Sequence, residues 1–296
     1  MRITVTGASG FIGRRLLERL QAAGHAVSVL GRKPAGGLPF YFWEAGGENQ
    51  PPEESLRGAD AVVHLAGEPV AQRWTEEAKR RIRLSRVGGT RRMVEALARL
   101  PRRPGVLVCA SAVGYYGARG EEVLTEASPP GTGFLSEVCL GWEQAAAAAE
   151  SLGLRVVRLR IGMVLGRDGG ALARMLPPFK LGLGGRLGDG RQWMSWIHRD
   201  DLAELIRFAV EEQALAGAVN AVAPVPVTNA EFTRQLAAAL HQPAWFPAPA
   251  AALRALFGEM ASVLLDSQRA VPAAAQAAGF AFRFPELRGA LERLLG

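Results

Sequence analysis

Three glycines near the start of the chain, Gly7, Gly10 and Gly13, have the spacing of a phosphate-binding turn. They follow an apolar stretch at 3–5, which predicts a buried strand, and they lead into 11–23, which predicts a helix ended by a glycine. Glycines let the backbone approach a pyrophosphate, and a helix N-terminus offers free N–H groups and a positive dipole end. The G-x-x-G-x-x-G spacing makes this turn one residue longer than the standard one. The residues expected to contact a dinucleotide here are Thr6, Gly7, Ser9, Gly10, Phe11, Ile12 and Gly13.

The second apolar stretch, at 26–30, ends in Gly31, Arg32 and Lys33. In a dinucleotide fold, an acidic residue about 20 positions after the glycines bonds the 2′-hydroxyl of NAD. The two cations found here suit the 2′-phosphate of NADP instead, because a guanidinium can hold a phosphate with two parallel hydrogen bonds. We therefore predict that NADP(H) is preferred over NAD(H). The alternative interpretation is that both cations are solvated surface charges.

The elements that must position these residues alternate along the chain. Apolar stretches at 61–67, 106–111 and 155–160 predict further strands, and 75–100 and 136–152 predict helices between them. Such alternation is typical of an α/β doubly wound parallel sheet, and its right-handed crossovers place all strand C-termini on one edge. Gly7, Arg32, Ala66 and Ser111 all fall on that edge.

The alternation of apolar strands and helices ends at about residue 165. A glycine-rich stretch at 182–190 predicts a loop, 196–210 leads into a helix, 217–222 predicts a returning strand, and 228–231 is a capping box. We expect a Rossmann domain at 1–165 and a smaller, mainly helical substrate domain at 166–296. Residues 195–222 are expected to return to the Rossmann sheet.

Composition restricts the class of protein. With 296 residues, 49% of them apolar, the chain can bury a large core. The two cysteines, Cys109 and Cys139, and four scattered histidines form no disulfide framework and no metal site, which suits a reducing cytoplasm. No apolar run approaches the roughly 18 residues of a membrane span, and the chain opens on a core strand rather than a signal peptide. The net charge of +7 fits an anionic small molecule better than a nucleic acid, because the basic run at 79–83 lacks interleaved aromatic residues.

The motifs together resemble the extended short-chain dehydrogenase/reductase superfamily, which includes nucleotide-sugar epimerases. The resemblance is closest to its atypical, epimerase-like YfcH-type branch. It implies NADP binding by a Rossmann domain, with a C-terminal substrate domain closing the cleft. It also implies that Leu65, Ala66, Gly67, Arg86 and Val164 approach the cofactor. The stretches that carry the resemblance are 6–13, 60–67, 89–90, 111–117, 177–185, 193–198 with Asp201, and 258–260.

The departure from the superfamily concerns proton transfer. Catalytic members use a Tyr, which passes a proton to or from the substrate, and a Lys four residues later, which lowers the Tyr pKa and holds the nicotinamide ribose. In this sequence the corresponding positions are Phe134 and Val138. The Asn that usually stands three positions before Gly-Thr is Arg86. The usual proton relay is therefore absent.

Three residues are candidates to replace it. Ser111 ends a core strand, where the superfamily keeps a Ser or Thr that bonds the substrate carbonyl, although its spacing to Tyr116 differs by one residue. Tyr115 could supply a hydroxyl, and Glu68, directly after the cofactor loop, could be a general base. Each also has a purely structural interpretation: a strand-end hydroxyl, a packed aromatic ring and a solvated carboxylate.

The substrate candidates are Arg186 and Arg191, because cations in a glycine-rich loop beside a cleft suit an anionic substrate, and Trp193, which either lines the cleft or fills the core. His198 with Asp200 could be interpreted as a dyad, but the resemblance implies a structural anchor. Two functions remain open: an NADP(H)-dependent oxidoreductase or nucleotide-sugar epimerase of atypical mechanism, or a non-catalytic NADP(H)-binding sensor or partner protein. We expect a small-molecule substrate, no nucleic acid, no membrane, and a monomer or homodimer.

Overall fold

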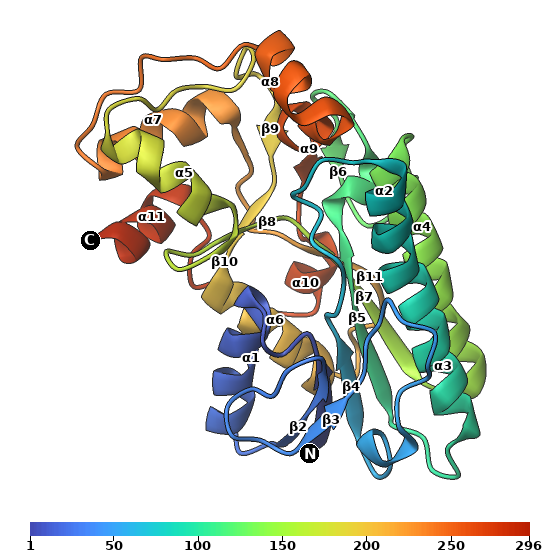
Figure 1. Cartoon of the computed structure of the whole chain (residues 1–296). Helices are drawn as coiled ribbons and strands as arrows, with labels where there is room; N and C mark the ends of the chain where they lie inside the picture. The colour runs from blue at the N-terminus through green and yellow to red at the C-terminus, as the bar shows by residue number, and fades with distance from the viewer.

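A parallel seven-stranded sheet stands at the centre of the computed structural model, which describes all 296 residues (Figure 1). The strand order is β3-β2-β1-β4-β5-β7-β11. From β1 the chain first moves to one edge of the sheet and then, from β4, to the other edge, and open α/β sheets bind ligands at this switch point. The predicted doubly wound α/β fold is confirmed. The strands are β1 (Arg2–Thr6), β2 (Ala26–Gly31), β3 (Phe40–Phe42), β4 (Ala61–His64), β5 (Val106–Ala112), β7 (Arg155–Ile161) and β11 (Gly217–Ala221).

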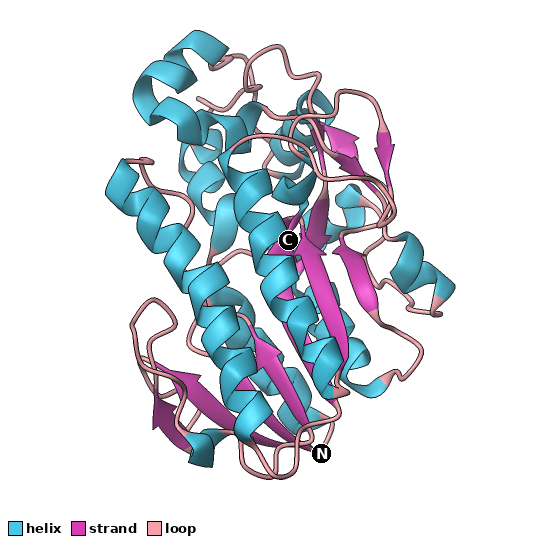
Figure 2. Ribbon diagram, turned by 90° about the vertical axis from the view of Figure 1, so that its right-hand side faces the viewer, coloured by secondary structure: helices cyan, strands magenta, loops and turns pink.

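Helices cover both faces of this sheet, so its central strands are apolar almost throughout. The helices α1 (Phe11–Ala22) and α6 (Arg199–Glu211) pack together on one face. On the other face α3 (Gly89–Arg99) packs against α4 (Phe134–Ala147), and both helices run alongside the strands (Figure 2). Two apolar cores result, one on each side of the sheet.

Two predicted elements differ in their bounds. The strand expected at 61–67 ends at His64, because the Thr6 hydroxyl accepts the N–H groups of Leu65 and Ala66 and takes this segment out of the ladder. The helix expected at 75–100 is interrupted: α2 (Glu76–Arg83) is followed by a π-helical turn, η2 (Leu84–Gly88), before α3 begins. Such turns inside helices often occur at functional sites.

The C-terminal part is mainly helical and has its own core around Trp196 and Phe232. Short two-stranded ladders join it to the rest: β8 with β10, β9 with β12, and β6 with β13. Its last third also returns to the large sheet, because α10 packs on β11. The remaining helices are α5 (Gly170–Lys180), α7 (Asn229–Ala239), α8 (Ala250–Phe257), α9 (Ser262–Leu265), α10 (Ala273–Ala277) and α11 (Leu287–Leu295), with short turns η1 (Glu53–Ser55), η3 (Val113–Tyr116), η4 (Ala148–Leu152) and η5 (Gly258–Ala261). The short strands are β6 (Val123–Leu124), β8 (Met163–Leu165), β9 (Trp193–Met194), β10 (Trp196–His198), β12 (Val227–Thr228) and β13 (Arg269–Ala270).

Candidate functional site

The turn between β1 and α1 has the shape of a phosphate cradle. Gly7 has φ +69°, and a Cβ there would lie 2.8 Å from the carbonyl carbon of Leu65. At Gly13 a Cβ would lie 2.2 Å from the Gly7 carbonyl oxygen, so no larger residue fits. Gly10 caps α1 without a side-chain hydrogen bond, which leaves the first N–H groups of the helix for an anion. The residues therefore fit the pyrophosphate of a dinucleotide.

Thr6 and Phe11 support this turn from two sides. The buried Thr6 hydroxyl joins His64 Nδ1 at 2.8 Å and accepts two backbone N–H groups, which fixes the end of β4 beside the cradle. The ring of Phe11 lies against the glycines at 166–170, where a Cβ at Gly166 or Gly169 would come within 2.5 Å of it. This contact ties the first turn of α1 to the segment after Val164, which leads into the C-terminal part. Ser9, next to the cradle, is exposed.

Arg32, directly after β2, has an exposed side chain without a close ion pair. Its side chain is 65% exposed, and its nearest carboxylate, on Glu44, is 3.7 Å away. Lys33 is also exposed, and Gly31 is partly buried. An exposed pair at this distance contributes little, so the guanidinium is available to a phosphate.

The loop after β4 holds Gly67 and Glu68 beside η2. The Glu68 carboxylate points toward Gln72 and Arg81, with 3.5 Å between Oε1 and Arg81 Nε. Arg86 donates from Nη1 to the Glu68 backbone carbonyl at 2.8 Å rather than to this carboxylate. The structure thus places Arg86 against the loop after β4 and gives the Glu68 side chain a partner elsewhere.

Ser111 belongs to a buried polar network. Its hydroxyl donates to Glu143 Oε1 at 2.8 Å. Arg160 binds the same carboxylate through two parallel hydrogen bonds, from Nε at 2.8 Å and from Nη2 at 2.9 Å. Both side chains of this ion pair are less than 7% exposed. Because the Ser111 proton is committed to a carboxylate, its oxygen is left as a hydrogen-bond acceptor.

The two tyrosines of η3 differ in their surroundings. Tyr116 is fully buried: its hydroxyl donates to Asn220 Oδ1 at 2.7 Å and accepts from Arg160 Nη1, and burial raises its pKa. Tyr115 lies with its ring centroid 3.5 Å from Arg160 Cζ. Its hydroxyl makes no hydrogen bond to the protein, and the residue as a whole is 8% exposed.

The positions of the usual relay are filled by apolar packing. Phe134 lies edge-on to Trp74, with 5.1 Å between the ring centroids. Val138 is buried in the same cluster, together with Met260 from η5. The C-terminal part of the chain therefore helps to fill the place where the Tyr and Lys of catalytic relatives would stand.

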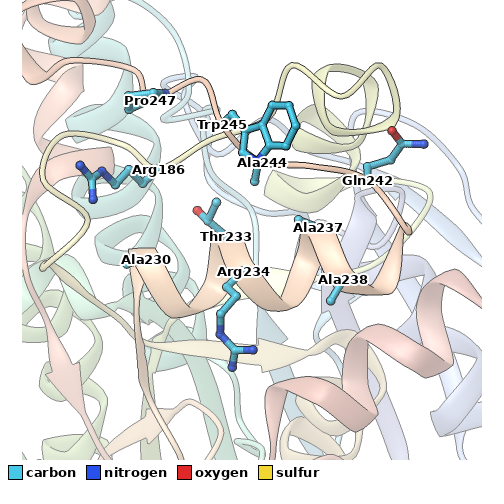
Figure 3. A pocket seen from close by; sticks show the side chains of 10 residues that line it. All are labelled: Arg186, Ala230, Thr233, Arg234, Ala237, Ala238, Gln242, Ala244, Trp245 and Pro247. Atoms are coloured by element: carbon cyan, nitrogen blue, oxygen red, sulfur yellow. The ribbon is translucent and has the colours of Figure 1, made fainter.

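The substrate candidates are separated in space. Trp193 donates from Nε1 to Glu121 at 2.6 Å, and Arg269 Cζ lies 4.2 Å from its ring centroid. Arg186 lines a different hollow, of about 580 Å³, between α7 and the loop that carries Trp245 (Figure 3). No residue of the large sheet lines this hollow. Arg191 is exposed, and its backbone N–H is bonded to the Asp189 carboxylate.

His198 and its neighbours join helices rather than forming a dyad. His198 Nδ1 accepts the Asp200 N–H and caps α6, while its ring lies 4.0 Å from that of Phe284. The Asp200 carboxylate binds Arg15 of α1 through two hydrogen bonds, and that of Asp201 accepts two backbone N–H groups near Phe284. Burial lowers the pKa of His198 to about 4, so the ring is neutral near pH 7.

Sequence reasoning missed Glu143, Arg160 and Asn220. Each lies in an element that is predicted from its apolar pattern, and the polar residue within it was overlooked. Arg160 does carry a signal, since it stands between two of the four apolar residues of its strand and cannot be buried without an acceptor. Its partner, 17 residues earlier, could not be found from spacing alone.

A family model described as the NAD dependent epimerase/dehydratase family matches residues 3–221. The chain belongs to this family. A second model, the domain of unknown function DUF1731, matches residues 248–294. An Arabidopsis thaliana relative, named epimerase family protein SDR39U1 homolog, chloroplastic, is 43% identical over 305 residues, which cover 100% of this chain and 87% of the relative. The human epimerase family protein SDR39U1 is 39% identical over 300 residues and 100% of both chains.

A solved structure extends the agreement to three dimensions. The crystal structure of human SDR39U1 (isoform 2) with NADPH matches this epimerase-family chain with a TM-score of 0.89 and 38% identity, over 100% of this chain and 99% of that one. The protein is therefore an NAD(P)-binding member of the family with a Rossmann fold. None of its helices has the length and apolar character to cross a bilayer.

Proposed function

We propose that the protein is an NADP(H)-dependent oxidoreductase or epimerase-like enzyme acting on a small, anionic molecule. Residues 1–165 form the cofactor domain and 166–296 the substrate domain. A bound nicotinamide supplies the hydride chemistry, between its C4 and a carbonyl or alcohol carbon. The free cradle N–H groups and the available Arg32 support the choice of NADP(H). Two solved structures that hold UDP-glucose, MoeE5 and a UDP-glucose 4-epimerase of Thermotoga maritima, share the fold at 23% identity or less, so a nucleotide sugar is one candidate class.

The observation that carries this proposal is the pairing of Tyr115 with Arg160. The Tyr115 hydroxyl makes no hydrogen bond to the protein, although the residue is only 8% exposed, and its ring is held by the guanidinium. Ser111 is joined to the same cation through Glu143. Tyr115 Oη is therefore our donor or acceptor of the substrate proton, and Ser111 Oγ accepts a hydrogen bond from the substrate. Glu68 contributes less, because its carboxylate already faces Arg81.

A second candidate function has its own supporting observation. The apolar cluster of Phe134, Val138 and Met260 closes the place of the usual relay, as expected for a protein that kept the cofactor and lost the chemistry. Such a protein would be a non-catalytic NADP(H) sensor or partner.

Binding and turnover, measured together, distinguish the two functions. Purified protein with NADPH and a panel of nucleotide sugars and small carbonyls would be followed by nicotinamide fluorescence, absorbance and product analysis, which also detects silent epimerisation. The enzyme hypothesis expects turnover that falls at least about a hundredfold in Tyr115→Phe, the range of a lost general acid or base, with NADPH affinity retained. Ser111→Ala should lower turnover less.

Matched variants control for packing. Tyr41→Phe and Ser151→Ala remove the same hydroxyl groups at positions outside this network and should change nothing. Turnover unaffected by both Tyr115→Phe and Ser111→Ala would refute our site assignment. NADPH binding without turnover on the whole panel would favour the sensor.

A further inference from the structure

The hollow between α7 and the loop at 242–248 is separate from the edge of the large sheet. Its volume of about 580 Å³ lies within the usual range of small-molecule sites, which is about 300–1,000 Å³. No residue of the cradle, of η3 or of the large sheet lines it. A ligand in this hollow would therefore be held by the C-terminal part of the chain alone.

Thr233 brings an unpartnered hydroxyl to the lining of this hollow. The residue is 5% exposed, and its Oγ1 atom makes no hydrogen bond to the protein. Its side chain rises from α7 toward the loop that carries Trp245 (Figure 3). A buried hydroxyl without a partner is costly, and native proteins keep few of them. A ligand in the hollow would supply the missing partner.

Arg186 brings a cation to the same hollow. Its side chain is exposed and forms no ion pair with a carboxylate of the protein. A Cβ at Gly190 would lie 3.1 Å from Ala230 Cβ and 3.2 Å from Arg186 Cδ. The stem of Arg186 therefore runs beside the first turn of α7, one turn before Thr233.

The charges around the hollow favour a carboxylate. No acidic residue lines it, and its other arginine, Arg234, is paired with Glu231 at 2.6 Å and points away from the loop (Figure 3). A phosphate commonly uses free N–H groups at a helix N-terminus. Those of α7 are occupied, since Ala230 N–H donates to the Gly190 carbonyl and Glu231 N–H donates to the Thr228 hydroxyl. A single guanidinium matches the two oxygens of a carboxylate.

Trp245 adds a flat apolar surface. The residue is 79% exposed, although a side chain of this size is highly buried on average. Aromatic rings stack on such a surface in an offset arrangement. Ala237, Ala238 and Ala244 make the neighbouring lining apolar and leave space beside the indole. The hollow thus combines a place for a ring with a place for an anion.

We propose that this hollow is a second ligand site, which binds a small aromatic carboxylate. The carboxylate pairs with the Arg186 guanidinium and accepts a hydrogen bond from Thr233 Oγ1, while the ring stacks on Trp245. The site goes beyond the proposed function and does not depend on it, because it uses no group of the cofactor cradle or of the polar network around Ser111.

The indole signal of Trp245 tests this site directly. The probe is 2-naphthoate, which has both the ring and the carboxylate, whereas 2-naphthamide lacks the charge and cyclohexanecarboxylate lacks the flat ring. In ¹⁵N-labelled protein, the chain's six tryptophans each give an indole N–H signal, and the one missing from Trp245→Leu reports on the hollow. This signal should shift as 2-naphthoate is added. The other two probes should each bind at least about tenfold more weakly.

Two variants separate the charge from the hydroxyl. Arg186→Gln should weaken 2-naphthoate at least about tenfold, the scale of a lost charge-assisted hydrogen bond. Arg191→Gln removes an arginine of the same glycine-rich loop that does not line the hollow, so it is the matched control and should change nothing. Thr233→Val should weaken the probe about threefold and leave the protein at least as stable in urea, because it removes an unpaired buried hydroxyl.

Four results would contradict the proposal. A Trp245 signal that no probe shifts would overturn it, and so would unchanged affinity in Arg186→Gln. Displacement of 2-naphthoate by NADPH would place the probe in the cofactor site and overturn the separate hollow. Tighter binding of adenosine 5′-monophosphate than of 2-naphthoate at the same signal would overturn the carboxylate as the ligand.

Discussion

The two halves of the sheet edge are built differently: one from backbone groups and the other from side chains. On the β1–β3 side, the cofactor cradle is made of backbone, and Gly7 and Gly13 leave no space for a side chain. On the β5–β7 side, the candidate groups are side chains of β5 and η3, held by the buried pair of Glu143 from α4 and Arg160 from β7. The first half keeps the form common to dinucleotide folds, while the second has Phe134 and Val138 at the positions of the usual relay. If the proposed function holds, cofactor binding and proton transfer depend on different residues and can be changed separately.

The strongest way to break the first half is Gly13→Ala. A Cβ there would lie 2.2 Å from the Gly7 carbonyl, so the turn must open and lose its phosphate geometry. NADPH affinity should fall by more than about a hundredfold, because several backbone hydrogen bonds to charged phosphates are lost at once. Gly289→Ala, in α11 with nothing within 4 Å of its Cβ position, is the control and should bind normally. Normal NADPH titration of Gly13→Ala would contradict the cradle.

A substitution in the buried pair of the second half should lower the stability of the protein rather than its affinity for the cofactor. Glu143→Leu leaves Arg160 buried without its partner, which should lower the free energy of unfolding by about 3–5 kcal/mol. The double variant Glu143→Leu, Arg160→Met removes the stranded charge and should recover much of this loss in urea titrations. A single variant as stable as the wild type would show that the pair is not buried as described.

Arg32→Ala sharpens the comparison within the cofactor side. Its loss should weaken NADPH by more than about tenfold and leave NADH nearly unchanged, because only NADPH carries a 2′-phosphate. Arg57→Ala removes an equally exposed arginine that pairs with Glu53 and should affect neither cofactor. Equal effects of Arg32→Ala on both nucleotides would remove the basis for preferring NADP(H).

The same contrast explains how far the sequence could be interpreted. The backbone conformation of the cradle requires glycine, and buried parallel strands require apolar runs. The cradle and the strands can therefore both be predicted from residue types. The interruption of the helix at η2 carries no proline, and the glycines at its end and directly after it, at 88 and 89, also have helical backbone angles. A π-helical turn therefore could not be predicted there, nor could the contact of Arg86 with the loop after β4 that depends on it.

The polar network could not be predicted from the sequence for a different reason. Ser111, Glu143 and Arg160 come from β5, α4 and β7, and each looks ordinary within its own element. Only the fold brings them together, and only burial makes the charges costly enough to need one another. The candidates Ser111 and Tyr115 could be named from their place at the strand end, but not the ion pair that holds them.

Two buried histidines, His64 and His198, give the smallest predicted effect. Burial lowers the pKa of His64 and of His198 to about 4, whereas an unfolded histidine titrates near 6.5. Below about pH 6.5 the unfolded chain takes up protons that the native protein does not, so stability falls as the pH drops toward 4. For His198 alone, the loss from about pH 7 to about pH 5.5 should be about 1 kcal/mol. His198→Asn keeps a good N-cap for α6 and removes this titration. Urea titrations at both pH values should therefore show a smaller loss in the variant, with the share of His64 remaining, and an unchanged loss would mean that the native His198 ring takes up protons as readily as an exposed one.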